Sequence, residues 1–176
     1  MRIRISRVKS LGFFLWHGRH ELYHVILGVF WIYILQRYWI IGDFKLLWVS
    51  VFASLLPDAD HIFYVLTYGR KEKYAVSLKF FIKDRQWRNL WIFMEKGHKK
   101  NTALATHNYL VTFLCLGATV LSIVEKWETT TILFGSMFFH YLFDIADDIM
   151  VLGRVNDNWK RVRRVKGVRN DAHFHP

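Results

Sequence analysis

Cysteine and proline are scarce in this chain of 176 residues, and each shortage excludes a class of structure. The one cysteine, Cys115, lies in an apolar run, which excludes a disulfide framework and a cysteine-based metal site within the chain. The two prolines are Pro57 and Pro176, and there are only ten glycines. Long loops and low-complexity segments are richer in both residue types. The sequence therefore predicts a single domain, residues 1–176, made of regular secondary structure.

Acidic residues are also few, since 14 Asp and Glu stand against 25 Lys and Arg and give a net charge of +11. At the same time, 53% of the residues are hydrophobic. The charges fall in blocks between long apolar runs, which is typical of a small polytopic membrane protein. The alternative is a basic soluble helical domain with a large core, but runs of this length are rare in small soluble cores.

Four apolar segments are long enough to cross a bilayer as helices. They cover approximately residues 22–41, 46–67, 107–124 and 131–152. Residues 1–21 are basic and lack the apolar core and small-residue cleavage site of a signal peptide, so we expect an arm lying on the membrane surface. The predicted fold class is an all-α integral membrane protein with about four transmembrane helices plus basic interfacial helices.

Lys and Arg residues gather on one side of this four-span topology. Residues 1–21 carry five of them, residues 68–106 carry ten, and residues 153–176 carry seven. The two other connectors are short and poor in basic residues. The positive-inside rule then predicts a multi-pass protein of the cell (inner) membrane with both termini and the 68–106 connector in the cytoplasm.

The 68–106 connector contains a helical pattern of large apolar residues. Trp87, Leu90, Trp91 and Met94 recur at helical spacing, with basic residues on both sides. Such a basic amphipathic helix either lies among the anionic headgroups of the lipid bilayer or packs on the rest of the protein. Nucleic-acid binding would use the same charge, but we expect no nucleic-acid partner.

Ionisable side chains interrupt the apolar segments, where their cost in lipid makes a function the default interpretation. With the orientation above, they all fall in the cytoplasmic half of the membrane. The candidates are His24, Asp58, Asp60, His61, His107, His140, Asp144, Asp147 and Asp148.

The residue types and their spacing point to a metal site. Neutral imidazole and carboxylate groups are ligands for zinc and for manganese or iron. His140 and Asp144 are four residues apart, and Asp58 and His61 are three apart, so each pair shares one helix face. Asp60 points elsewhere on a regular helix, so it could bind a second ion or orient a histidine.

Several of these residues have plainer alternatives. His24 could be a hydrogen-bonded interior histidine, and His20 competes with it on the same helix face. Asp147 and Asp148 approach the headgroups, where they could simply be solvated. Pro57 lacks an N–H and restricts the preceding residue, so we expect a kink or a restarted helix there, which could aim the following carboxylates at a common point.

The order of the motifs "HVILG", "LLPDADH", "THNYL" and "GSMFFHYLFD" resembles the YdjM-like family of membrane-bound metal-dependent hydrolases, the LexA-regulated inner-membrane type. The resemblance covers roughly residues 20–150. The matched positions are His24, Gly28, Pro57, Asp58, Asp60, His61, Thr106, His107, His140 and Asp144. The chain departs from the family where "TALATHN" lacks a His-Arg pair and where "DIADD" replaces D-x-x-T.

Taken together, the residues and the resemblance predict a metal-dependent hydrolase. One or two divalent ions, with zinc favoured over manganese or iron, would be held by His24, Asp58, Asp60, His61, His107, His140 and Asp144. Such an ion activates water and polarises the scissile group. An unligated Asp60 or Asp148 could serve as the general base. A site at the cytoplasmic interface favours an anionic lipid, a phosphodiester or another ester as substrate.

Two rival functions follow from the same residues. In the first, the metal only holds the helices together, or is itself transported, and the protein is not an enzyme. In the second, the chain is a phosphatidic-acid-phosphatase-like enzyme, which also uses H-x-x-x-D. That enzyme type needs a Lys/Arg-Pro motif and a Ser-Gly-His motif, and both are absent from this sequence.

Overall fold

The computed structural model describes residues 10–38, 45–97 and 104–160, and these ranges are helical without any strand. The predicted all-α class is therefore confirmed. In chain order the helices are α1 (Ser10–Tyr38), α2 (Lys45–Leu55), η1 (Leu56–Asp58), α3 (Ala59–Leu66), α4 (Lys73–Lys83), α5 (Trp87–Gly97), α6 (Tyr109–Val124), α7 (Glu128–Leu152) and η3 (Asp157–Lys160).

The four predicted spans coincide with helical segments, but only one of these is a candidate membrane span. Within the described ranges, residues 46–66, which include α2 and α3, form the single helix long and apolar enough to cross a bilayer. The apolar helix α6 has 16 residues and is shorter than a typical span. Length and composition thus support one span rather than about four, and core helices of soluble proteins also meet this criterion.

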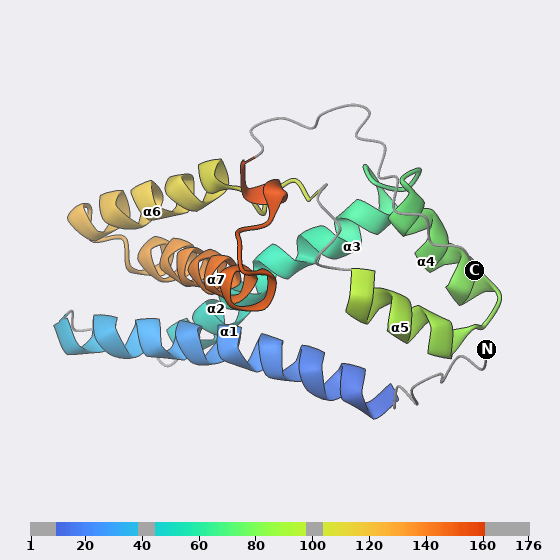
Figure 1. Ribbon diagram of the computed structural model, residues 1–176. Helices are drawn as coiled ribbons and strands as arrows, with labels where there is room; N and C mark the ends of the chain where they lie inside the picture. The colour runs from blue at the N-terminus through green and yellow to red at the C-terminus, as the bar shows by residue number, and fades with distance from the viewer. Residues whose placement is uncertain (1–9, 39–44, 98–103, 161–176) are drawn as a thin grey trace.

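Helices α1, α2, α6 and α7 form a bundle, with α7 in contact with each of the other three (Figure 1). Small side chains allow the close approaches inside it. Gly28 of α1 lies against α2, where an added Cβ would be 3.0 Å from the Ser50 hydroxyl oxygen. That hydroxyl donates to the Gly28 carbonyl at 2.7 Å and lies 2.7 Å from the Ser136 hydroxyl of α7. The bundle is therefore joined by small and polar residues.

Helix α6 is arranged with its polar residues inside and its large apolar residues outside. The buried residues are Thr112, Cys115, Thr119 and Ser122. The side chains between 56% and 69% exposed are Phe113, Leu114, Leu121 and Val124. Helix α2 repeats the pattern, since Ser50 and Ser54 are buried whereas Phe52 is 70% exposed. This is the reverse of the arrangement expected for helices that face water.

The helix is interrupted at Pro57, as the sequence predicts. Helix α2 ends at Leu55, the short 3₁₀ helix η1 contains Pro57, and α3 restarts at Ala59. Proline removes one backbone donor and its ring disfavours a continuous α-helix, which accounts for the break. Helix α3 then leaves the bundle and runs towards α4 and α5 (Figure 1).

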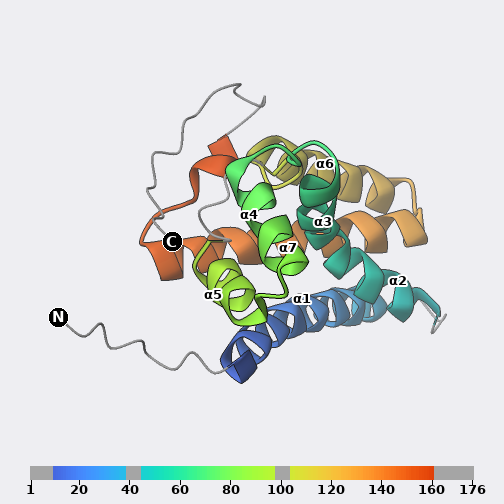
Figure 2. The ribbon, with the colours of Figure 1, turned by 90° about the vertical axis from the view of Figure 1, so that its right-hand side faces the viewer.

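The segments outside the predicted spans differ from expectation in two ways. Residues 10–21 are not a separate arm but the first turns of α1, continuous with the rest of that helix. The 68–106 connector contains the predicted helix, α5, and also α4, which the sequence pattern did not indicate. The two pack together at one end of the bundle (Figure 2). Residues 1–9, 39–41 and 161–176 of the predicted arm, first span and tail lie outside the described residues.

Candidate metal centre

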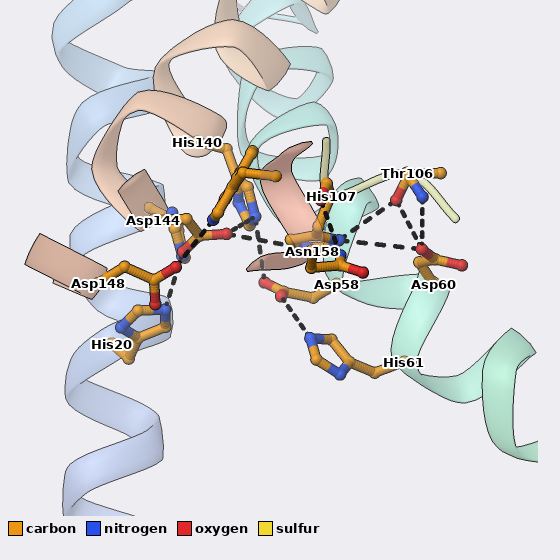
Figure 3. Close-up of polar contacts among 12 residues, drawn as sticks. His20, Asp58, Asp60, His61, Thr106, His107, His140, Asp144, Asp148 and Asn158 are labelled. Carbon is orange, nitrogen blue, oxygen red and sulfur yellow. Dashed lines mark hydrogen bonds and ion pairs between the residues drawn. The ribbon is translucent and has the colours of Figure 1, made fainter. Parts of the chain in front are cut away.

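Seven histidine and aspartate side chains converge where α1, η1, α3 and α7 meet the start of α6 (Figure 3). They form four overlapping groups of three, and the possible ligand atoms of each group lie within 4.8 Å of one another. The seven are His20, His24, Asp58, His61, His107, His140 and Asp144. Six of the seven predicted ligands are thus brought together; Asp60 is not among them, and His20 joins the set.

Asp144 lies at the centre of the set and offers its two carboxylate oxygens to different histidines. Its Oδ1 is 3.2 Å from His20 Nε2 and 3.4 Å from His24 Nε2. Its Oδ2 is 3.1 Å from His140 Nε2 and 3.4 Å from His107 Nε2. Each oxygen therefore faces its own pair of imidazoles.

Asp58 lies between His140 and His61. Its Oδ2 is 3.8 Å from His140 Nε2, and its Oδ1 is 3.9 Å from His61 Nε2. The residue lies in η1, directly after Pro57. Of the two carboxylates that the kink is expected to aim at a common point, Asp58 thus lies beside His140 of α7, whereas Asp60 is not in the set.

The tautomer of His140 is fixed by the backbone of a neighbouring helix. Its Nδ1 lies 2.7 Å from the Ser54 carbonyl oxygen, which can only accept, so Nδ1 carries the proton and donates it. The Nε2 atom then keeps its lone pair and points at Asp58 and Asp144. Ligand histidines in metal sites usually donate their second nitrogen to an oxygen in this way.

Several atoms of the set are buried without a hydrogen bond from any residue in the described ranges. They are both ring nitrogens of His24, Nε2 of His107, Nε2 of His140 and Oδ2 of Asp58. Burying unpaired polar atoms costs free energy, and a divalent cation would remove that cost by coordinating them. The donor set, imidazole plus carboxylate, suits zinc, manganese or iron. The residues therefore fit a divalent metal ion.

Asp60 has a different environment from the seven. Its Oδ1 accepts a hydrogen bond from the Tyr68 hydroxyl at 2.5 Å, and its Oδ2 accepts two from Thr106, from the backbone N–H and from Oγ1, each at 2.8 Å. The same Oδ2 is 3.9 Å from His107 Nδ1. Burial raises the pKa of Tyr68, and its bond to Asp60 raises it further, so the phenol remains a donor. Asp60 thus fixes the segment that carries His107.

His107 is also held from its other side. Asn108 caps α6 by accepting from the Val111 N–H at 3.0 Å, which places His107 one residue before the helix. The Asn158 side-chain amide donates to the His107 carbonyl at 2.7 Å. The ring therefore reaches the other ligands from a backbone that is fixed at both ends.

Asp148 anchors the segment that follows α7. Gly153, with φ 67°, ends α7 in the left-handed conformation and turns the chain back. The Asp148 Oδ2 atom then accepts from the Trp159 indole N–H at 2.8 Å and from the Asn156 backbone N–H at 3.2 Å. Trp159 is buried beside the His107 ring. From the sequence, residues 153–176 are described only as basic, so the contacts of Asn156 and Trp159 with Asp148 are not predicted.

A cavity of about 720 Å³ adjoins the ligand set. His20, Asp58, His61, His107 and Asp144 reach it from the ligand set, and Asp148 also lines it. Most of the remaining wall is apolar and comes from α3, α4 and α5, with further residues from α1, α2, the segment before α6 and the segment after α7. Burial raises the pKa of Tyr74 in this wall to about 12, so its hydroxyl stays protonated.

The connector helix α5 turns its apolar face to this cavity. Leu90, Trp91 and Met94 line the cavity, whereas Trp87 is 52% exposed. Of the two placements that the sequence left open, packing on the rest of the protein therefore accounts for most of this face.

Comparisons of the chain with protein-family models, curated proteins and solved structures found no match. The resemblance to the YdjM-like hydrolases therefore remains a prediction from the motifs.

Proposed function

We propose that this protein is a multi-pass membrane hydrolase that uses one or two divalent metal ions to cleave an ester or phosphodiester of a lipid at the cytoplasmic interface. One observation carries the proposal: a buried set of imidazole and carboxylate atoms without hydrogen bonds borders a large amphipathic cavity. Structural zinc sites are closed by four protein ligands, whereas catalytic sites keep a position open to substrate. The cavity supplies that open side.

The reversed polarity of the bundle supports the membrane part of the proposal. Large apolar side chains on α2 and α6 are exposed, while the threonines and serines of these helices are buried. In lipid, helices associate through small and polar residues, because apolar side chains gain nothing by leaving hydrocarbon. On this proposal α1, α2 with α3, α6 and α7 are the four spans, and α4 and α5 lie at the cytoplasmic interface.

The seven converging side chains would hold the metal. His20, His24 and Asp144 Oδ1 could form one site, and His107, His140 and Asp144 Oδ2 a second. When bound, a divalent ion supplies Lewis-acid activation of water and of the scissile group. Zinc is the first choice, and manganese or iron would suit the same donors.

Of the two carboxylates that the sequence offered as general base, Asp148 is better placed than Asp60. Asp148 lines the cavity, where it could receive a proton from an attacking water. Asp60 is not among the residues that line the cavity, and its two oxygens accept hydrogen bonds from Tyr68 and from Thr106, which lies on the segment that carries His107. We therefore propose Asp148 as the base and Asp60 as a positioning residue for His107.

The test compares metal content and hydrolysis in purified protein. Wild type is expected to retain up to two zinc, manganese or iron ions per chain by elemental analysis and to cleave phospholipids or phosphodiesters in mixed micelles. The double variant Asp58→Ala, His140→Ala should lose both properties. Asp84→Ala, which removes an exposed carboxylate of the α4–α5 turn, is the matched control and should keep both.

Two results would contradict the proposal. If purified wild type contains no bound metal, the proposed metal centre is refuted. Wild type with bound metal but without cleavage of any phospholipid or phosphodiester would favour the non-enzymatic alternative, in which the ion holds the helices together or is transported.

A further inference from the structure

The cavity beside the ligand set has two chemically different ends. At one end lie the imidazoles and carboxylates of the candidate metal centre. At the other end the wall consists of apolar side chains from α4, α5 and the segment before α6: Leu78, Leu90, Trp91, Met94 and Leu104. A volume of about 720 Å³ is within the range of sites for small organic ligands. A ligand that matches it has one polar end and one long apolar part.

The rim of the cavity is apolar as well. Ile62 and Leu66, four residues apart on α3, line the cavity and are each 63% exposed. Ile82 on α4 also lines it and is 49% exposed. A mouth bordered by branched aliphatic side chains is unfavourable in water and favourable against hydrocarbon. The cavity therefore opens where an apolar chain could enter from a bilayer.

The outer surface of α4 is suited to the same boundary. Lys73, Lys79 and Lys83 are exposed on it, and Val76 and Phe80 are each 51% exposed between them. Lysines interleaved with apolar residues on a short helix are typical of a helix in the headgroup region of an anionic membrane. This charge would favour lipids with anionic headgroups beside the mouth.

We propose that the cavity binds one hydrocarbon chain of an anionic membrane lipid, entering between Ile62, Leu66 and Ile82, so that the headgroup linkage lies against the ligand set. The position of the headgroup rests on the proposed function, whereas binding of the chain depends only on the cavity. A chain that leaves the bilayer for an equally apolar wall gains little hydrophobic free energy. The cavity would therefore contribute by holding the scissile linkage in register with the ligands.

A peptide segment is a poorer occupant of this cavity. Its backbone N–H and C=O groups would need partners along their whole length, and the α4–α5 part of the wall consists mostly of aliphatic and aromatic carbon. A hydrocarbon chain has no hydrogen-bonding groups and needs no such partners.

Photo-crosslinking in nanodiscs tests this directly. The probe is a phosphatidic acid with a diazirine on one acyl chain, at trace level in phosphatidylcholine, and labelled residues are located by mass spectrometry. Wild type should be labelled at Leu78, Leu90 and Met94. Leu78→Trp, which fills the cavity, should lower that labelling by about tenfold. The control Val76→Trp changes an exposed residue on the same helix and should leave it unchanged.

Further arms separate chain binding from folding and from hydrolysis. Ile82→Trp blocks the mouth at a half-exposed position and should give the same loss even if Leu78→Trp does not fold. Labelling confined to outward residues such as Val29 and Phe113, or unchanged in both blocking variants, would overturn the inference. The Asp58→Ala, His140→Ala variant should lose metal but keep the labelling. If the protein hydrolyses lipid but its cavity residues are not labelled, the proposed function is supported and only the binding of a hydrocarbon chain in the cavity is refuted.

Discussion

Replacing Asp60 with asparagine should weaken metal binding without removing a binding site. The carboxylate accepts three hydrogen bonds, one on Oδ1 from Tyr68 and two on Oδ2 from Thr106. An asparagine side chain has only one acceptor oxygen. If that oxygen keeps the two Thr106 bonds, its NH₂ group meets the Tyr68 hydroxyl, which must turn and accept. The substitution therefore loses the negative charge near His107 and disturbs one side of the network.

The expected size follows from the position of Asp60 behind a ligand. Mutating a group that orients a metal-binding histidine typically lowers affinity by about 10–100-fold. That range corresponds to about 1.4–2.7 kcal/mol of binding free energy. Tyr68→Phe removes one neutral donor and leaves both Thr106 bonds, so its effect should be smaller, about 1 kcal/mol. Asp60→Ala loses all three bonds and should be the weakest binder.

A competition titration against a chromogenic zinc chelator measures the affinities, and elemental analysis at saturating zinc measures the stoichiometry. The number of ions per chain should be equal in wild type, Asp60→Asn and Tyr68→Phe. One ion fewer in Asp60→Asn would show that Asp60 is itself a ligand. Wild-type affinity in Asp60→Asn would show that it does not position His107. Circular dichroism must first show that each variant retains its helix content.

Two further predictions concern packing and topology. Gly135→Ala should destabilise the bundle by about 1–3 kcal/mol, because its Cβ would overlap an indole of α1; Gly117→Ala, with nothing within 4 Å, should not. Denaturant unfolding followed by circular dichroism distinguishes the two. In a Cys115→Ser background, a membrane-impermeant maleimide added to intact cells should label Glu125→Cys, whereas Lys79→Cys should react only after lysis. Labelling of Lys79→Cys in intact cells would reverse the predicted orientation.

Several of the converging histidines and aspartates could be identified from the sequence because their spacing is local. Residues four apart on a helix, such as His140 and Asp144, share one face. Residues three apart, such as Asp58 and His61, do so as well. Periodicity also placed His20 and His24 on one face, but it presented them as competitors. In the structure both lie near the same oxygen of Asp144. That shared partner is 120 or more residues away in the sequence, and local spacing carries no information about it.

The parts that the sequence did not reveal depend on long-range contacts. Trp159 lies in the basic segment 153–176, to which the sequence assigns no contact, yet its indole donates to Asp148 and its ring packs beside His107. Tyr68 lies beyond the end of α3, at Leu66, so helical spacing does not predict its hydrogen bond to Asp60. In both cases the contact joins residues whose proximity no local sequence pattern indicates.

The break at Pro57 connects the two halves of the proposed site. It places Asp58 in η1, where the carboxylate reaches His140, and it sends α3 away from the bundle. Two residues of the redirected helix, Ile62 and Leu66, then form the rim of the cavity. An uninterrupted helix over residues 45–66 would continue along the axis of α2 at 1.5 Å per residue and could not supply that rim. One helix break thus accounts both for a proposed metal ligand, Asp58, and for the apolar residues at the mouth of the cavity beside it.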